Sequence, residues 1–305
     1  MNETSTNRTL FLLLVLAAAT SAGTGSQATF SSPDEAAKAL VAAVESGNYP
    51  LFLTIAGTRM AEFWSVGDPV RDVLERERFL DEAHRNGIIT VARADDQKVL
   101  YVGNIEEPFP APLMKTGSGW RFDGQAGSVE LAARRTRRNE NAAVELCRRF
   151  RDAEFAYLGS DHRGTPTFAQ TIRSTPGQRD GLFWNDAGGE DESPLGPFFA
   201  SAAFAEKQSN EEPRPLFGYY FKILLAQGPD AYGGALDYCV KGRLRKGFAL
   251  IAWPAEYGVD GVRSFLINHF GDVYQKDMGP DTSRMAECME VFNPDRSWTR
   301  VAGYR

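Results

Sequence analysis

The sequence predicts an α+β protein in which helices and an antiparallel sheet precede a long helix packed on a four-stranded antiparallel meander. Three observations support this fold class. Apolar residues recur with a helical period near the N-terminus, with a period of two over residues 88–122, and again with a period of two in four runs over residues 216–277. Since 305 residues exceed the roughly 150 of a usual single domain, we expect two domains, over residues 30–127 and 128–305.

The first predicted domain begins with helices. Ser32 is a suitable N-cap and Pro33 suits the first helical position, and the apolar residues that follow keep the helical spacing up to Val44. Two further helices are expected, over residues 49–55 and 71–87. From Ile88 the period of the apolar residues changes to two. Strands separated by turn residues are therefore expected over residues 87–95, 97–104 and 109–123.

The second predicted domain begins with one long helix over residues 128–158, whose apolar stripe runs from Ala143 to Tyr157. An irregular region follows up to about Ser193. Within and after it we expect short helices near residues 168–173, 194–208 and 281–291, and strands over residues 216–225, 247–255, 261–269 and 271–277. The last two of these strands are predicted to form a hairpin, because only a tight turn separates them.

The N-terminus has the pattern of a secretory signal peptide over residues 1–22. Ten apolar residues from Leu10 to Ala19 follow a basic residue and precede small residues. As a helix they would rise about 15 Å, half the thickness of a hydrocarbon core, which disfavours a membrane span. Cleavage after Ala22 or after Ala28 suits the small residues there, and the absence of a nearby Cys excludes a lipoprotein anchor. We therefore expect a periplasmic or extracellular protein with no membrane span after cleavage.

The charge of the chain argues against a nucleic-acid partner. Its formal net charge is −6, whereas phosphate contacts need a basic surface. The one basic run, at residues 134–138, is interpreted as a solvated helix face. Other envelope proteins are the expected partners.

Three cysteines occur in a chain that we expect in an oxidising compartment, and an odd number cannot pair completely. Cys147 lies on the apolar stripe and is predicted to be a small buried residue. Cys239 and Cys288 are the one pair for which a disulfide is considered.

The segment GQRDGLFWNDAGGEDE, residues 177–192, is the best candidate for chemistry in the chain, because it combines one Arg, three Asp, two Glu and a Trp in sixteen positions. Carboxylates on such a loop can act as acid and base or bind a metal ion, although the calcium-binding order of an EF-hand is missing. The same residues also suit an ordered surface loop, since glycine permits positive φ and proline fixes the next helix entry. The ligand-binding candidates are Glu140, Arg179, Asp180, Trp184, Asp186 and Glu190.

Glu140 is a candidate because it lies one helical turn before Ala143 on the apolar stripe. A carboxylate on an apolar face must find a partner or undergo an upward pKa shift. It could be a general acid or a ligand contact, or it could accept hydrogen bonds from the backbone or an Arg of a packed loop.

No catalytic or cofactor motif accompanies these candidates. The sequence has no GxSxG or HExxH motif and no phosphate-binding or dinucleotide fingerprint, and its three histidines, His84, His162 and His269, form no recognisable arrangement. We therefore expect no cofactor and lean against an enzyme.

Six ordered segments of residues 130–301 resemble a bacterial family of exported proteins, domain of unknown function 2950. Its landmarks stand here as RRNENAAVELCRRFRDAEFAY, STPGQRDGLFW, ESPLGPFFA, GYYFKILLAQGPDAYGGALDYCVKG, GFALIAWPAEYGVDGVRSFLINHFGDVYQKDMG and SWTRV. The resemblance implies nothing about activity.

Two more distant resemblances concern shape. Helices followed by strands ending in GWRFD are similar to the cone fold of the nuclear-transport-factor-2-like superfamily. The C-terminal part resembles the globular heads of type IV pilins and pseudopilins, but it lacks their apolar stalk and Gly-Phe peptidase site. The residues that carry the second resemblance are Asn139, Glu140, Ala143, Tyr157, Gly218 to Phe221, Gly258, Gly261, Arg263, Phe265, Gly271, Val273 and Tyr274.

The leading hypothesis from the sequence is an exported envelope protein that acts through protein contacts without catalysis. The alternative is a hydrolase or a ligand- or metal-binding protein centred on residues 177–192. It requires Glu140, Arg179, Asp180 and Trp184 to meet in a concave pocket.

Overall fold

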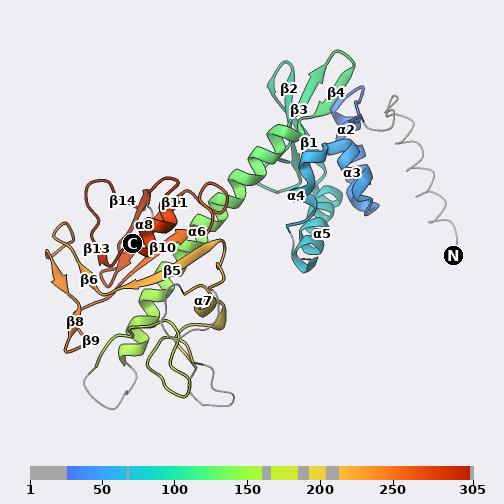
Figure 1. Ribbon diagram of the computed structural model, residues 1–305. Helices are drawn as coiled ribbons and strands as arrows, with labels where there is room; N and C mark the ends of the chain where they lie inside the picture. The colour runs from blue at the N-terminus through green and yellow to red at the C-terminus, as the bar shows by residue number, and fades with distance from the viewer. Residues whose placement is uncertain (1–25, 67–68, 160–165, 185–191, 204–212, 303–305) are drawn as a thin grey trace. The chain divides into compact units, whose positions relative to one another are not determined.

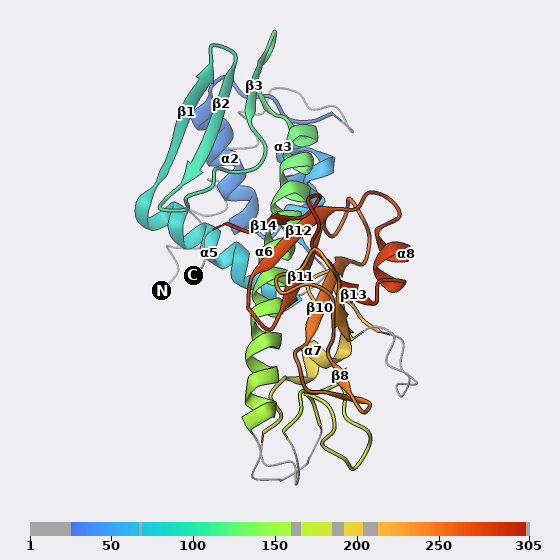
Figure 2. The same ribbon diagram turned by 90° about the vertical axis from the view of Figure 1, so that its left-hand side faces the viewer.

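The structure, a computed structural model, describes residues 26–66, 69–159, 166–184, 192–203 and 213–302. It is a mixed α+β protein with antiparallel sheets, as the sequence predicts (Figures 1 and 2). The chain divides into two compact units, Met1–Arg134 and Arg135–Arg305.

The helices of the first unit begin where the sequence offers caps. Ser32 accepts a hydrogen bond from the Glu35 backbone N–H, and Asn48 accepts one from that of Leu51. The helical elements are α2 (Pro33–Glu45), α3 (Tyr49–Ala56), the 3₁₀ turn η1 (Thr58–Met60), α4 (Ala61–Trp64) and α5 (Pro69–Asn86).

The sheet of the first unit is antiparallel in the order β1-β2-β3-β4. Phe30 adds a short bridge to it, because its backbone exchanges hydrogen bonds of 2.8 and 2.7 Å with Trp120. Buried residues of α2, α3 and the sheet share one core that includes Leu40, Phe52 and Phe122. The strands are β1 (Ile88–Ala94), β2 (Gln97–Val102), β3 (Leu113–Thr116) and β4 (Gly119–Phe122).

One helix, α6 (Gly124–Gly159), contributes residues to both units. In its first turn, Gly127 allows close packing: a Cβ there would lie 2.3 Å from Met60 Sδ and 2.8 Å from Ala111 Cβ. Farther along, its predicted stripe is buried in the core of the second unit, from Ala143 to Tyr157.

The main sheet of the second unit contains the predicted meander. Its order is β14-β12-β11-β10-β5, and Figures 1 and 2 show α6 alongside it. The short edge strand β14 comes from the C-terminal segment and was not predicted. The strands are β5 (Tyr219–Leu224), β10 (Ala249–Pro254), β11 (Arg263–Asn268), β12 (Val273–Asp277) and β14 (Thr299–Arg300).

Smaller elements complete the second unit. Parallel pairing of β13 with β6 joins the C-terminal segment to the residues after β5. These elements are α7 (Pro197–Ser201), β6 (Ala226–Gln227), β7 (Leu236–Asp237), β8 (Cys239–Val240), β9 (Arg243–Leu244), α8 (Thr282–Glu287) and β13 (Val291–Phe292).

Two expected helices differ from the structure. Residues 168–173 are not helical, because their backbone groups bond elsewhere: the Phe168 N–H donates to Leu244 O at 2.9 Å, and Arg173 bridges to Phe183. The helix expected over residues 194–208 is reduced to the five residues of α7, and residues 204–208 lie outside the described residues. Propensity over a few residues is overridden by tertiary pairing here.

The considered disulfide is not formed, since Cys239 and Cys288 are both free. Cys239 pairs with Leu244 in the β8–β9 hairpin, whereas Cys288 is the C-cap of α8, which contacts β10. Different elements therefore hold the two thiols. Cys147 is fully buried as expected, and burial raises the pKa of its thiol to about 12.

Candidate functional site

Glu140 holds a loop of the second unit to α6. Its Oε1 accepts hydrogen bonds of 3.1 Å from the backbone N–H groups of Val262 and Arg263, and its Oε2 pairs with Arg263 Nη1 at 2.9 Å. The Glu140 side chain is 10% exposed. Its neighbour Asn139 donates to Asp260 O at 2.9 Å. The carboxylate therefore accepts both backbone and Arg hydrogen bonds from a packed loop.

Tyr219 braces the same loop from the sheet. Its hydroxyl donates to Arg263 O at 2.8 Å, and burial, followed by the charge of Glu140, raises the pKa of this phenol. Gly261 allows the contact, because a Cβ there would lie 2.1 Å from Tyr219 Oη.

Asp180 closes a turn on its own segment. Its carboxylate accepts hydrogen bonds from Thr175 N at 2.7 Å and Thr175 Oγ1 at 2.6 Å. Beside it, the Arg179 guanidinium lies over the Trp184 ring, 5.4 Å from the centroid. Tyr157 donates from its hydroxyl to Arg179 O at 3.1 Å, which ties this turn to the end of α6.

The candidates of the sequence do not all meet. Arg179, Asp180 and Trp184 lie together near Tyr157, whereas Glu140 lies 17 residues earlier on α6. At 1.5 Å per residue this is about 25 Å along the helix. Asp186 and Glu190 lie outside the described residues. A pocket containing Glu140 together with residues 179–184 is therefore not present.

The structure places another carboxyl group, Glu154, within electrostatic reach of Tyr157, and sequence reasoning missed it. Glu154 is fully buried; its Oε2 accepts a 2.9 Å hydrogen bond from Ala169 N, and none of the described residues hydrogen-bonds to its Oε1. Burial raises its pKa well above the usual value. Burial also raises the pKa of Tyr157, and the charges of Asp180 and Glu154 add to this effect. The sequence does carry a signal for Glu154: it lies four residues after Phe150, which places it on the apolar stripe and predicts that it is buried.

The histidines form no catalytic arrangement among the described residues. His84 is exposed at the end of α5, and His162 lies outside the described residues. His269 is partly buried among aromatic rings, none of the described residues hydrogen-bonds to its Nδ1, and burial lowers its pKa.

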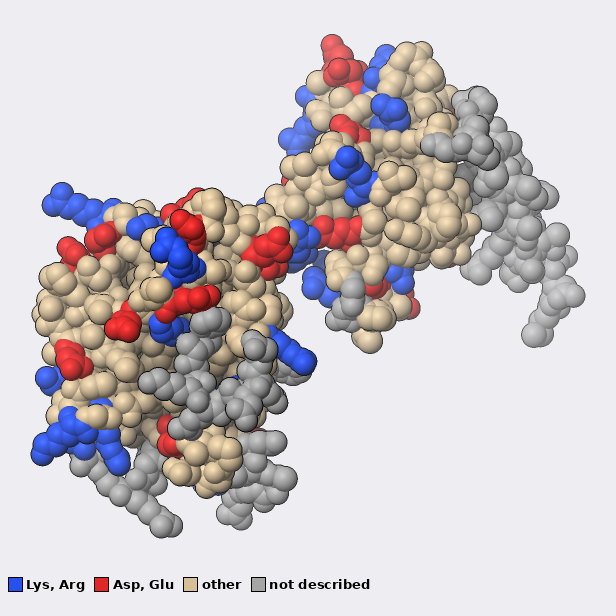
Figure 3. Space-filling model, in the orientation of Figure 1, with Lys and Arg blue, Asp and Glu red and all other residues tan. Residues whose placement is uncertain are grey.

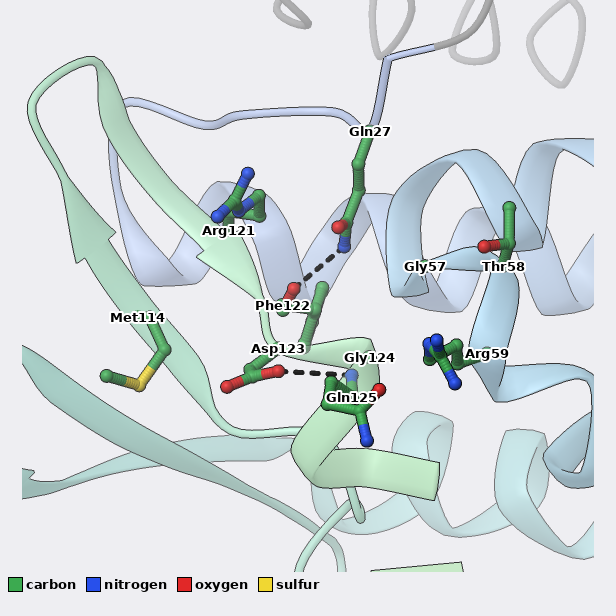
Figure 4. Close-up of a pocket in the computed structure, with 10 residues that line it drawn as sticks. All are labelled: Gln27, Gly57, Thr58, Arg59, Met114, Arg121, Phe122, Asp123, Gly124 and Gln125. Atoms are coloured by element: carbon green, nitrogen blue, oxygen red, sulfur yellow. Dashed lines mark hydrogen bonds between the residues drawn. The ribbon is translucent and has the colours of Figure 1, made fainter. Parts of the chain in front are cut away.

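A pocket of about 340 Å³ opens in the first unit, where β4 leads into α6 (Figure 4). Gln27 spans its inner side by donating from Nε2 to Ile55 O at 3.1 Å and to Phe122 O at 2.8 Å. Asp123 caps α6 by accepting from the N–H groups of Gln125 and Ala126. No sequence motif marks this pocket, because its residues come from four separate segments: Gln27, Gly57, Thr58, Arg59, Met114, Arg121, Phe122, Asp123, Gly124 and Gln125.

The described part of the chain has neither a metal-binding cluster nor a membrane-spanning helix. It contains no group of three or more His, Cys, Asp or Glu side chains arranged to hold a metal ion. Nor does any described helix combine the length and apolarity that crossing a bilayer requires. On the face in Figure 3, basic and acidic side chains are interspersed over each unit, so this view shows no extended basic patch.

The fold and the residues above define an α+β protein of two units. Its candidate carboxylates Glu140 and Asp180 accept hydrogen bonds from loops of the same chain. A family model described as "Protein of unknown function (DUF2950)" matches residues 27–301, so the chain belongs to that family. No curated protein and no solved structure matches the chain.

Replacing Glu140 tests its role as a clamp. Glu140→Ala leaves two backbone N–H groups and a guanidinium without their acceptor, so we expect the free energy of unfolding to fall by about 3 kcal/mol. The matched control is Glu145→Ala on the same helix, whose side chain is 55% exposed in a pair with Arg149 and should change stability by less than about 1 kcal/mol. Urea unfolding measures both. Equal effects of the two substitutions would contradict the clamp.

Replacing Glu154 tests its burial as a neutral acid. In Glu154→Gln, the side-chain amide oxygen can still accept from Ala169 N. Because the folded-state pKa of Glu154 is raised, the wild-type protein loses stability as the pH rises above the unfolded-state pKa, by at most about 1.4 kcal/mol per pH unit. We therefore expect Glu154→Gln to stabilise the protein more at pH 8 than at pH 5, as measured by urea midpoints. Glu145→Gln is the control, and a Glu154→Gln effect that does not change with pH would rule out the neutral acid.

Proposed function

We propose that this protein is exported from a bacterial cell and acts in the envelope as a non-enzymatic interaction module. The observation that carries the proposal is the use of Glu140 and Asp180, the two described carboxylates that the sequence nominated for chemistry. Both accept hydrogen bonds from their own chain, Glu140 from Val262 and Arg263 and Asp180 from Thr175. A general base needs a free acceptor within reach of a substrate proton, and these carboxylates are engaged in holding loops.

An exposed aromatic pair on the second unit supports action through protein contacts. Tyr232 is 80% exposed and Phe270 is 53% exposed, and their rings are in edge contact with centroids 5.4 Å apart. Aromatic side chains supply much of the binding energy at protein interfaces. A long helix beside an antiparallel meander is also what the resemblance of the sequence to pilin heads implies, so we include a pilin-like head in the proposal.

Export rests on the apolar run from Leu10 to Ala19, and the fold favours one of the two cleavage sites. Cleavage after Ala28 would remove Gln27 and Ala28, which donate hydrogen bonds to Ile55 O, Phe122 O and Thr54 O. Cleavage after Ala22 leaves these bonds in place. We therefore propose that the mature chain begins at Gly23.

N-terminal sequencing of the protein recovered from a periplasmic fraction tests export. We expect Gly23 as the first residue, and Ala22→Lys should block processing because signal cleavage needs small residues. Thr29 as the first residue would contradict the proposed site. An intact chain retained in the cytoplasm would contradict export.

Assays of the mature protein test the absence of catalysis. We expect no turnover of peptidoglycan fragments, glycosides, esters or peptides above the level of a mock preparation. Thr175→Val is the matched control for Asp180→Ala, because it removes one hydrogen bond of the same turn but keeps the carboxylate. A turnover that Asp180→Ala abolishes and Thr175→Val retains would establish the alternative, a hydrolase centred on residues 177–192.

A further inference from the structure

The pocket of the first unit has a positive lining that the fold does not neutralise. Arg59 and Arg121 both line it, and Figure 4 shows them on different sides of the opening. Both residues are exposed, and among the described residues neither guanidinium has an ion-pair or hydrogen-bond partner. Other arginines of this unit do have partners: Arg134, for example, pairs with Glu130 at 2.7 Å and with Glu107 at 3.4 Å.

The one acidic residue of the lining is already engaged. Asp123 Oδ1 accepts from the N–H groups of Gln125 and Ala126 at 3.1 and 3.0 Å. The Asp123 carboxylate supplies the negative charge that stabilises the N-terminus of α6. The end of the helix is therefore already occupied and is not the proposed binding site. Two guanidinium groups and one capping carboxylate leave a net charge of +1 on the lining.

The rest of the lining suits a polar ligand. The side chains of Thr58 and Gln125 are exposed, and neither makes a hydrogen bond with another described residue. Of the lining residues only Met114 and Phe122 are apolar, and Phe122 is fully buried. Purely apolar ligands favour pockets with mostly apolar walls, so this pocket suits a ligand rich in oxygen atoms.

Glycines keep the inner wall of the pocket in place. Gly57 adopts φ +101°, and a Cβ there would lie 3.2 Å from Gly124 Cα and 3.3 Å from Gln27 Nε2. A Cβ at Gly124 would in turn lie 2.9 Å from Ala56 O. The backbones at positions 57 and 124 can approach this closely only because both residues are glycines. Gln27 is held beside them by its two hydrogen bonds.

We propose that this pocket binds a small, polar anionic molecule through Arg59 and Arg121. A carboxylate or phosphate group of the ligand pairs with the guanidinium groups, whose planar N–H donors match both oxyanions. The Thr58 hydroxyl and the Gln125 amide bind its other polar atoms. A volume of about 340 Å³ suits a molecule of the size of a sugar acid or a sugar phosphate, at the lower end of ligand pockets. The proposal is independent of the non-enzymatic role, because it concerns binding in the other unit.

Thermal unfolding of the mature chain with defined anions tests the site. The probes are sodium glucuronate, which carries a carboxylate, and inorganic phosphate, each compared with sodium chloride at equal ionic strength. We expect at least one probe to raise the midpoint saturably, and the responding probe identifies the oxyanion. Arg59→Gln and Arg121→Gln should each weaken that binding by roughly tenfold or more, since each removes a charged hydrogen-bond donor.

The matched control is Arg78→Gln, which removes the same charge from an exposed position on α5 outside the pocket. It should leave the binding unchanged. In sodium chloride alone, the Arg59 and Arg121 variants should unfold at the wild-type midpoint, because no partner in the fold is lost. Equal stabilisation of all variants, or no saturable effect of either anion, would overturn the proposal.

Discussion

The apolar stripe of α6 is the constraint on which the second unit depends. Ala143, Cys147, Phe150, Ala153 and Tyr157 are each at most 5% exposed and share one core with strands β5, β10 and β11. Burying a side chain such as Phe150 contributes about 1.5–3 kcal/mol, and a sheet of this kind needs a second layer to cover its apolar face. Without the stripe, the apolar face of the meander would lack the layer that covers it.

The same stripe accounts for the different hydrogen bonding and burial of two carboxyl groups, Glu140 and Glu154. Glu140 and Glu154 are 14 residues apart, close to four helical turns, so they lie on the same face of α6. Glu140 lies at the edge of the core, where loop 258–263 supplies two backbone N–H groups and Arg263. Glu154 lies inside it, where Ala169 N is its hydrogen-bond donor among the described residues, and burial raises its pKa. Position along one helix decides whether a glutamate holds a loop through hydrogen bonds or lies buried with a raised pKa.

Sequence reasoning located parts of each candidate site and missed the way they assemble. Asp180, Arg179 and Trp184 are close in sequence, and the structure keeps them close. Glu140 was singled out by its place on the stripe, but the periodicity of a helix gives no information on which loop packs against a given turn. Glu154 satisfies the same rule, because it lies four residues after Phe150, but the stripe was defined by its apolar residues alone and Glu154 was missed. The pocket beside Arg59 and Arg121 has no local pattern, since residues from four segments form it.

The sequence by itself determined the order and type of the main elements, because helical and strand periodicities, caps and turn residues are local properties. It predicted α6 within a few residues of its ends and the meander of β5, β10, β11 and β12 in sequence order. Only the tertiary structure decided that residues 168–173 are not helical, that β14 joins the sheet edge, and that Cys239 and Cys288 stay free. These outcomes depend on backbone groups and side chains that are distant in sequence, and a pattern within one segment does not encode the distance between two segments.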